Sequence, residues 1–305
     1  MKSCGTAPGA APNTVTMSMR STDLRGKSIL ITGGSMGIGF EAARSCLAYG
    51  ANVMICARGA AALDEATERL AAQGVEGDVA RVAGDVGSEH DVEGMFTAFS
   101  ERFGRPHGVI HAAGVYGPIG PITDVEPDAW WEAVRVNLFG TFLVARAAAR
   151  RMNAYGGGRI ALFSGGGASS PFPNYTAYAS SKVAVVRFAE TIAEELGPSI
   201  EVNCIGPGFV ATRLHEQTLA AGERAGGEFL EKTKAALSSG GVSATVGAEA
   251  AAFLVSDAAA GITGKFVAAQ YDDYRAWPSR LEALSGSELF TLRRVLPRER
   301  GLDWQ

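Results

Sequence analysis

From residue 28 onwards the chain alternates two hydrophobic patterns. Short runs of β-branched and apolar residues, typical of buried strands, are followed by longer amphipathic, alanine-rich segments, typical of helices. The pattern predicts strands over residues 28–32, 52–57, 79–84, 108–111, 159–164, 200–204 and 265–269. It predicts helices over residues 37–49, 60–73, 89–103, 127–153 and 178–196.

A strand that alternates with a helix in this way indicates an α/β fold with a parallel sheet. Because crossovers are right-handed, the expected architecture is a doubly wound sheet of about seven strands, a Rossmann fold, with ligands beyond the carboxyl ends of the strands. No internal repeat or linker divides the 305 residues, and such folds run to about 250 residues around one core. We therefore predict a single domain over residues 23–270.

Three segments stand apart from this pattern. Residues 1–22 contain Pro8 and Pro12 and no apolar run long enough for a signal-peptide core, which predicts a disordered tail. A transit peptide, to which the lack of acids before Asp23 would correspond, is the alternative. Residues 213–241 are polar, glycine-dotted and weakly helical, so they are either a lid over the substrate or a surface excursion. The extension over residues 271–305 is too apolar for a solvated tail. We expect it to be ordered, with helical turns at 281–284 and 289–296, and to cover a substrate pocket or a neighbouring subunit.

Composition narrows the class of partner. The net charge of −4 gives no broad positive field for nucleic acid or a membrane surface, and no apolar run is long enough to span a bilayer. The four cysteines are scattered and form no CxxC pair, so neither a metal site nor a disulfide framework is expected. These features predict a cytoplasmic protein with a small-molecule partner and no metal.

The first predicted strand runs into a glycine-rich turn and then a helix. Glycines let the backbone approach a pyrophosphate, and a helix N-terminus offers free N–H groups to an anion. The alternative is an ordinary flexible surface turn. The strand before it and the helix after it favour a dinucleotide site at Gly33, Ser35, Met36, Gly37, Ile38 and Gly39.

The second chemical signal is Tyr178-Ala-Ser-Ser-Lys182 at the start of a predicted helix. Residues four apart lie on one helix face. A phenol is a poor acid–base catalyst at neutral pH until a nearby ammonium stabilises its phenolate, which Lys182 is placed to do. The alternative is an ordinary pair on a helix surface.

With these motifs in this order, the sequence resembles the short-chain dehydrogenase/reductase family from about Leu24 to Ala269. The resemblance implies that Tyr178 exchanges a proton with the substrate oxygen and that Lys182 binds the nicotinamide ribose. It further implies that Asn137 helps to hold a water and that the protein forms a homodimer or homotetramer. The further cofactor contacts that it implies are Asp85, Val86, Ala112, Ala113, Gly114, Pro207, Gly208, Val210 and Thr212.

The sequence departs from the family pattern at three places. His111 replaces the first asparagine of the Asn-Asn-Ala-Gly turn, and the usual Gly-Gly after the last strand is absent. The spacing from Tyr178 puts the family's catalytic serine at Gly165, so we assign the oxygen-holding role to Ser164, one residue earlier. Ser169 and Ser170 are the alternatives.

The cofactor is predicted to be NADP(H), with NAD(H) as the alternative. NAD(H) specificity usually needs a carboxylate about 20 residues after the glycine turn, and no acid occurs between Glu41 and Asp64. Arg58 ends the second strand instead, where a guanidinium can fork onto a 2′-phosphate. A merely solvated arginine is the alternative.

Together these features predict an enzyme that moves a hydride between NADP(H) and a ketone or secondary alcohol. The competing hypothesis is a non-catalytic dinucleotide sensor of the same fold, which would need no Tyr178, Lys182 or Asn137. A methyltransferase also has a glycine-rich turn after its first strand, but it explains neither Tyr178 with Lys182 nor the Pro207-Gly208 turn. The substrate pocket is expected to include Tyr116, Phe172, Pro173, Phe209 and parts of residues 213–241.

Overall fold

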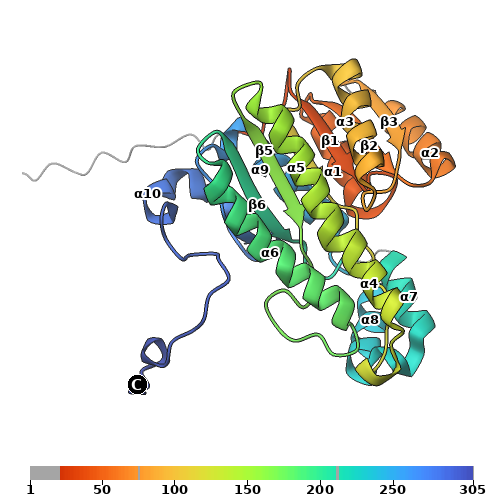
Figure 1. The fold of residues 1–305 in the computed structure, drawn as a ribbon, viewed down its shortest axis with the longest axis vertical. Coiled ribbons are helices and arrows are strands. Elements are labelled where there is room, and N and C mark those ends of the chain that lie inside the picture. The colour runs from red at the N-terminus through yellow and green to blue at the C-terminus, as the bar shows by residue number, and fades with distance from the viewer. Residues whose placement is uncertain (1–20, 75, 211–212, 305) are drawn as a thin grey trace, which may run out of the picture.

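The protein is built on one parallel sheet of seven strands in the order β3-β2-β1-β4-β5-β6-β7 (Figure 1). A computed structural model describes residues 21–74, 76–210 and 213–304, and the statements below concern these residues. The strands are β1 Ser28–Thr32, β2 Asn52–Ala57, β3 Val79–Ala83, β4 Gly108–His111, β5 Gly158–Phe163, β6 Ile200–Gly206 and β7 Phe266–Ala268. Each predicted strand is confirmed, with ends that differ by at most two residues.

Helices cover both faces of the sheet. One hydrophobic core lies between the sheet and α1, α2 and α9, and a second lies between the sheet and α3, α5 and α6. The helices are α1 Gly37–Ala48, α2 Ala60–Ala71, α3 Glu89–Phe103, α4 Pro127–Val134, α5 Gly140–Asn153, α6 Thr176–Leu196, α7 Arg213–Ala221, α8 Gly227–Ser238, α9 Ala244–Leu254 and α10 Leu281–Leu284. The doubly wound single domain is therefore confirmed.

The predicted helix over residues 127–153 is interrupted. A π-helical stretch, η2 Arg135–Phe139, separates α4 from α5, although the helical path is continuous. Such bulges within α-helices are frequent at functional sites. This one contains Asn137, whose side chain is fully buried.

Residues 213–241 are more helical than the sequence indicated. They form α7 and α8, joined by the short 3₁₀ helix η3 Gly222–Ala225. Buried Ala225, Leu230 and Thr233 anchor this helical pair to the domain.

The C-terminal extension packs on its own chain as far as residue 292. Tyr274 and Trp277 of the 3₁₀ helix η5 Tyr274–Arg280, with Leu284 of α10, are buried in the core beside α9. The carbonyl of Phe290 then accepts a hydrogen bond from the N–H of Phe266, and so covers the open edge of β7. The helical turn predicted at 289–296 is wrong, because this segment is irregular up to the 3₁₀ helix η6 Pro297–Arg300.

The two ends of the domain meet on one face. The guanidinium of Arg275 donates to the hydroxyl of Thr22 and to the carboxylate of Glu249 on α9. Residues 1–20 of the predicted tail lie outside the described residues, whereas Thr22 is buried. Past residue 292 the chain runs away from the sheet (Figure 1).

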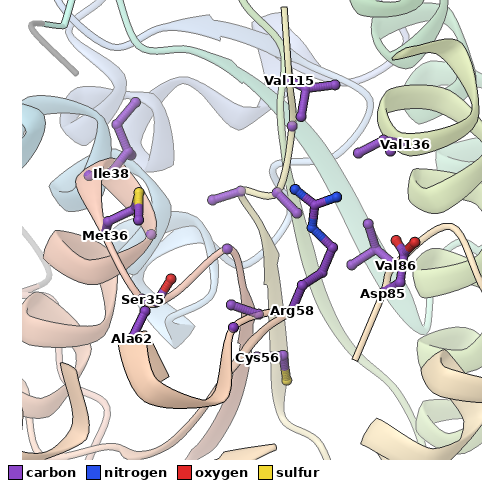
Figure 2. Close-up of a pocket in the computed structure, with 18 of the residues that line it drawn as sticks. Ser35, Met36, Ile38, Cys56, Arg58, Ala62, Asp85, Val86, Val115 and Val136 are labelled. Carbon is purple, nitrogen blue, oxygen red and sulfur yellow. The ribbon is translucent and has the colours of Figure 1, made fainter. Parts of the chain in front are cut away.

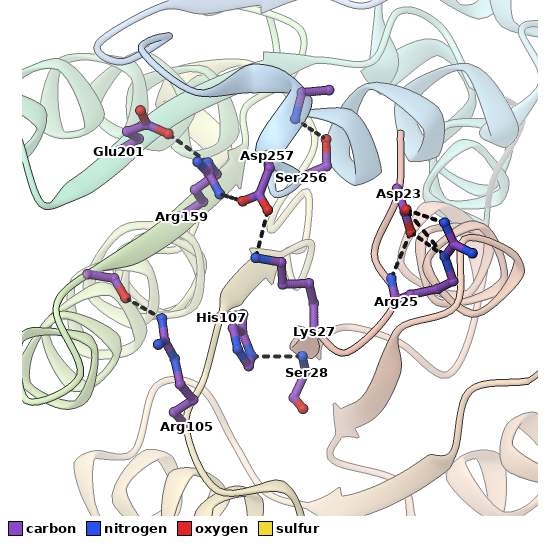
Figure 3. Close-up of polar contacts among 12 residues, drawn as sticks. Asp23, Arg25, Lys27, Ser28, Arg105, His107, Arg159, Glu201, Ser256 and Asp257 are labelled. Atoms are coloured by element: carbon purple, nitrogen blue, oxygen red, sulfur yellow. Dashed lines mark hydrogen bonds and ion pairs between the residues drawn. The ribbon is translucent and has the colours of Figure 1, made fainter. Parts of the chain in front are cut away.

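Charged side chains tie together the strands at the amino end of the sheet (Figure 3). The guanidinium of Arg159 bridges Glu201 and Asp257, and Asp257 also pairs with Lys27. The imidazole of His107 accepts the N–H of Ser28, which fits its pKa of about 4, lowered by burial and by nearby cations. This network lies at the end of the sheet opposite the site described below, so its role is structural.

No helix in the described ranges has the length and apolar character that a membrane crossing requires.

Candidate active site

A cavity of about 660 Å³ opens at the carboxyl ends of β1 and β4. The strand order reverses between these two strands, the place where doubly wound sheets bind ligands. The cavity is lined by every residue from Gly33 to Gly114 that the sequence assigned to the cofactor (Figure 2). Residues that the sequence analysis missed also line it: Cys56, Ala57, Gly59, Ala62, Gly84, Val115, Val136 and Gln217.

The glycine turn brings the start of α1 against the loop after β4. Gly33 has φ +70°, and a Cβ on it would lie 2.7 Å from the backbone nitrogen of Ala113. A Cβ on Gly39 would lie 2.2 Å from the carbonyl oxygen of Gly33. No side chain caps the N-terminus of α1, so its first N–H groups are available to an anion in the cavity. The turn therefore fits the pyrophosphate of a dinucleotide.

Arg58 extends from the end of β2 into the cavity (Figure 2). None of the described residues accepts a hydrogen bond from its guanidinium. Asp85, which also lines the cavity, is already held by Arg135 at 2.9 Å and by the N–H of Gly87. Although burial alone would raise the pKa of Asp85, these hydrogen bonds and the charge of Arg135 lower it. Asp85 is thus a fixed anion, and Arg58 is a cation still open to a ligand.

Tyr178 and Lys182 lie one turn apart on α6, and both side chains are buried. The Lys182 ammonium donates to the carbonyl of Phe163 at 2.9 Å and lies 5.8 Å from the centre of the Tyr178 ring. Burial lowers the pKa of Lys182 to about 8 and raises that of Tyr178 above its ordinary value. At neutral pH the phenol therefore keeps its proton and can act as an acid.

Asn137 links the π-helical stretch to the loop after β4 and to α6. Its amide accepts from the N–H of Val115 and donates to the carbonyl of the same residue, each at 2.8 Å. It also donates to the hydroxyl of Ser181. A Cβ on Gly114 would lie 3.2 Å from both the Asn137 amide oxygen and the Lys182 nitrogen, so the two side chains converge on one point.

The strand end at Ser164 and Gly165 does not place a serine beside Tyr178. The hydroxyl of Ser164 donates to the carbonyl of Lys182 at 2.8 Å and is buried. Gly165 is the residue that meets the phenol, because a Cβ on it would lie 2.1 Å from the Tyr178 oxygen. Ser169 and Ser170 are exposed. Ser164 could hold a substrate oxygen only by giving up its present hydrogen bond.

The remaining predicted residues surround these groups. His111, the replacement for asparagine, hydrogen-bonds to Thr32 at 2.8 Å, and burial lowers its pKa to about 3. Pro207, Gly208 and Val210 follow β6 but do not line the cavity. Thr212 lies outside the described residues.

An aromatic cluster surrounds Tyr178 beneath α7 and α8. The rings of Tyr116 and Phe172 meet that of Tyr178 edge-on, with centres 4.7 and 6.4 Å away. Of the residues that the sequence analysis placed at the substrate pocket, the structure brings Tyr116, Phe172 and Phe209 into this cluster. Pro173, which was predicted with them, is exposed. His215, Thr218 and Phe229 lie in the segment 213–241, which the sequence analysis included in the pocket without naming residues, and Tyr175 is the member of the cluster that it missed.

Residues 33–270 match the protein-family model described as enoyl-(acyl carrier protein) reductase. The chain belongs to the short-chain dehydrogenase/reductase family. It is 34% identical over 200 residues to a short-chain type dehydrogenase/reductase of Picea abies, covering 63% of this chain and 73% of the relative. The resemblance seen in the sequence is therefore confirmed, and the protein is an NAD(P)-dependent oxidoreductase rather than a methyltransferase or a sensor.

Solved structures of this family share the fold. A short-chain type dehydrogenase/reductase from Mycobacterium ulcerans superposes with a TM-score of 0.73 at 32% identity, covering 88% of this chain and 98% of that one. A variant of actinorhodin polyketide ketoreductase with NADPH superposes with a TM-score of 0.72 at 29% identity, covering 81% and 96%.

Proposed function

We propose that this dehydrogenase/reductase interconverts a ketone and a secondary alcohol with NADP(H), using Tyr178 as the general acid and base. The observation that carries the proposal is the buried pair of Tyr178 and Lys182 beside a cavity with a glycine turn on one side and Arg58 on the other. The direct test is a panel of ketones and alcohols assayed with NADPH and NADH at the nicotinamide absorbance band. Turnover of none of them with either cofactor would refute the proposal.

In this proposal the cofactor, when bound, supplies or accepts the hydride. Tyr178 gives its phenolic proton to the carbonyl oxygen in reduction and takes it back in oxidation. The Lys182 ammonium holds the ribose hydroxyls and favours the phenolate left after the transfer. Asn137 holds the loop that carries Gly114 and Val115 against α6, and would hold a water there for proton exchange. The aromatic cluster around Tyr178 excludes bulk water and favours a largely apolar ketone.

Arg58→Ala is expected to lower the preference for NADPH over NADH by about 100-fold, because a charge-assisted fork onto a 2′-phosphate contributes roughly 1.5–3 kcal/mol. The kcat/KM with NADH should change little. The matched control is Arg69→Ala on α2, whose guanidinium packs over Phe40 and does not line the cavity. An unchanged cofactor preference in Arg58→Ala would assign NADP(H) recognition to another residue.

The rate of ketone reduction is expected to be level below about pH 8 and to fall above it. Burial lowers the folded-state pKa of Lys182 to about 8. Its ammonium therefore loses its proton as the pH rises through that value. Its buried neighbours stay neutral over this range, since the pKa of Cys204 is raised to about 12 and that of His111 is lowered to about 3. In Lys182→Arg the guanidinium does not titrate in this range, so the activity that remains should not decrease above pH 8. A pH–rate profile of kcat with each protein measures it.

We also propose a homodimer or homotetramer in a cytoplasmic setting. Family members commonly form oligomers, and Trp131 and Phe139 are large apolar side chains that lie exposed on neighbouring helical segments. The mass in solution, measured by light scattering, tests the assembly, and a monomer would refute it.

A further inference from the structure

The carbonyl oxygen of a ketone has two lone pairs, and charge builds on it during hydride transfer. If Tyr178 donates to one lone pair, as the proposed function requires, the second needs another donor. The side chains at the end of β5 do not provide it. Gly165, which touches the Tyr178 oxygen, has no side chain, and the proton of the Ser164 hydroxyl is given to the carbonyl of Lys182.

Two other described hydroxyls near Tyr178, those of Ser181 and Tyr175, already donate their protons within the protein. Ser181 donates to the carbonyl of Tyr178 itself. Tyr175 donates to Thr218 of α7 at 2.8 Å, and both side chains are fully buried. The Thr176 hydroxyl, at the first residue of α6, is placed by Trp130, whose indole N–H it accepts at 3.1 Å. Among the phenols that contact Tyr178, Tyr116 is the remaining candidate for the second donor to the substrate oxygen.

Tyr116 is placed by three independent contacts. It follows Val115, whose N–H and carbonyl are both clamped by Asn137. Its ring stands edge-on to that of Tyr178, with centres 4.7 Å apart, and only 4% of it is exposed. Its hydroxyl lies 3.3 Å from the Nε2 atom of His215 on α7. Burial and the nearby Tyr178 oxygen raise its pKa, so it remains a neutral donor.

His215 is itself held in place. It is buried, and its ring packs on Phe209 with centres 4.0 Å apart. If its Nε2 carries the proton, that N–H donates to the Tyr116 oxygen, and the single proton of Tyr116 is then free for a ligand. The two residues lie 99 positions apart in the sequence and meet only in the fold.

We propose that Tyr116, oriented by His215, donates the second hydrogen bond to the substrate carbonyl oxygen, the role that a serine would otherwise fill. Tyr116 is then a catalytic residue and His215 a positioning residue. In reduction, the proton that the alcohol gains still comes from Tyr178, while Tyr116 keeps its own proton and stabilises the developing negative charge. The inference rests on the proposed function of Tyr178.

The test compares matched variants of the full chain in reduction of a ketone that the wild type turns over. Tyr116→Phe is expected to lower kcat by roughly 100-fold, the lower end of what the loss of one donor to a developing oxyanion costs, with little change in KM and in NADPH affinity. Tyr175→Phe is the matched control, because it also removes a phenol that bonds to α7 within the same cluster. We expect it to lower kcat by about threefold or less.

His215→Leu should lower kcat by about tenfold. The double variant Tyr116→Phe with His215→Leu should be no slower than Tyr116→Phe alone, since both changes remove one interaction. A general loss of packing would instead make the two effects multiply.

Three outcomes would overturn the inference and leave the proposed function standing. The first is a kcat in Tyr116→Phe close to that of the wild type. The second is an equal loss in Tyr116→Phe and Tyr175→Phe. The third is a fall in Ser164→Ala as large as that expected for Tyr116→Phe, which would return the role to Ser164. Ketone reduction that survives in Tyr178→Phe would instead overturn the proposed function, and the inference with it.

Discussion

Tyr178→Phe is expected to lower kcat for ketone reduction by about 1000-fold, within the range that a positioned general acid contributes. The substitution removes only the transferable proton, because the phenylalanine ring keeps the edge-on contacts with Tyr116 and Phe172. NADPH binding should stay nearly intact, since no cavity-lining contact is lost. Steady-state kinetics at saturating NADPH, with a fluorescence titration of NADPH, measures both effects.

Lys182→Ala is the informative companion variant. It deletes a buried ammonium that the proposed mechanism uses for both cofactor and phenolate, so it should weaken NADPH binding as well as kcat. More than a tenth of the wild-type rate in Tyr178→Phe, in protein that still binds NADPH, would rule out Tyr178 as the general acid.

Gly165→Ala is expected to reduce kcat by about 100-fold, although it adds a single methyl group. The new Cβ would lie 2.1 Å from the Tyr178 oxygen, so the phenol must move by an ångström or more, and a misplacement of that size can cost this much in rate. The effect should appear in kcat more than in the affinity for NADPH. Gly165→Ser should be at least as damaging, because it adds the same Cβ.

The neighbouring Gly166→Ala provides the control for Gly165→Ala. A Cβ there would lie 3.3 Å from the Cε1 atom of the half-buried Phe172 ring, a contact that a small ring shift relieves. It should leave kcat within a fewfold of the wild type. Equal effects of the two substitutions would show that the loop backbone, rather than the position of the Tyr178 hydroxyl, limits the rate.

Most of the fold could be predicted because strands and long helices each have a characteristic local spacing of hydrophobic residues. The strand 52–57 is a short apolar run, and α6 repeats its buried positions at helical spacing. The same reasoning failed at 289–296, where Leu289, Leu292 and Leu296 have helical spacing. There the edge strand β7 needs an acceptor for the Phe266 N–H, and the carbonyl of Phe290 satisfies it. A long-range hydrogen bond overrode a local pattern.

The residues of the cofactor cavity were predictable for a similar reason. The glycine turn, Arg58 and Asp85 each come within two residues of the end of a strand, and the ends of parallel strands meet at one edge of the sheet. Gln217 also lines the cavity but could not be found in this way. It sits on α7, far along the chain, and no periodicity ties that helix to the glycine turn.

The sequence by itself determined the fold class, the dinucleotide turn and the pairing of Tyr178 with Lys182, because each depends on spacing within one strand, turn or helix. Only the tertiary structure decided which groups surround the Tyr178 oxygen. Ser164 and Gly165 differ by one position at a strand end, and the backbone path there turns the serine to Lys182 and the glycine to the phenol. Tyr116 and His215 come from separate segments, and their contact exists only because the packing of α7 closes the distance.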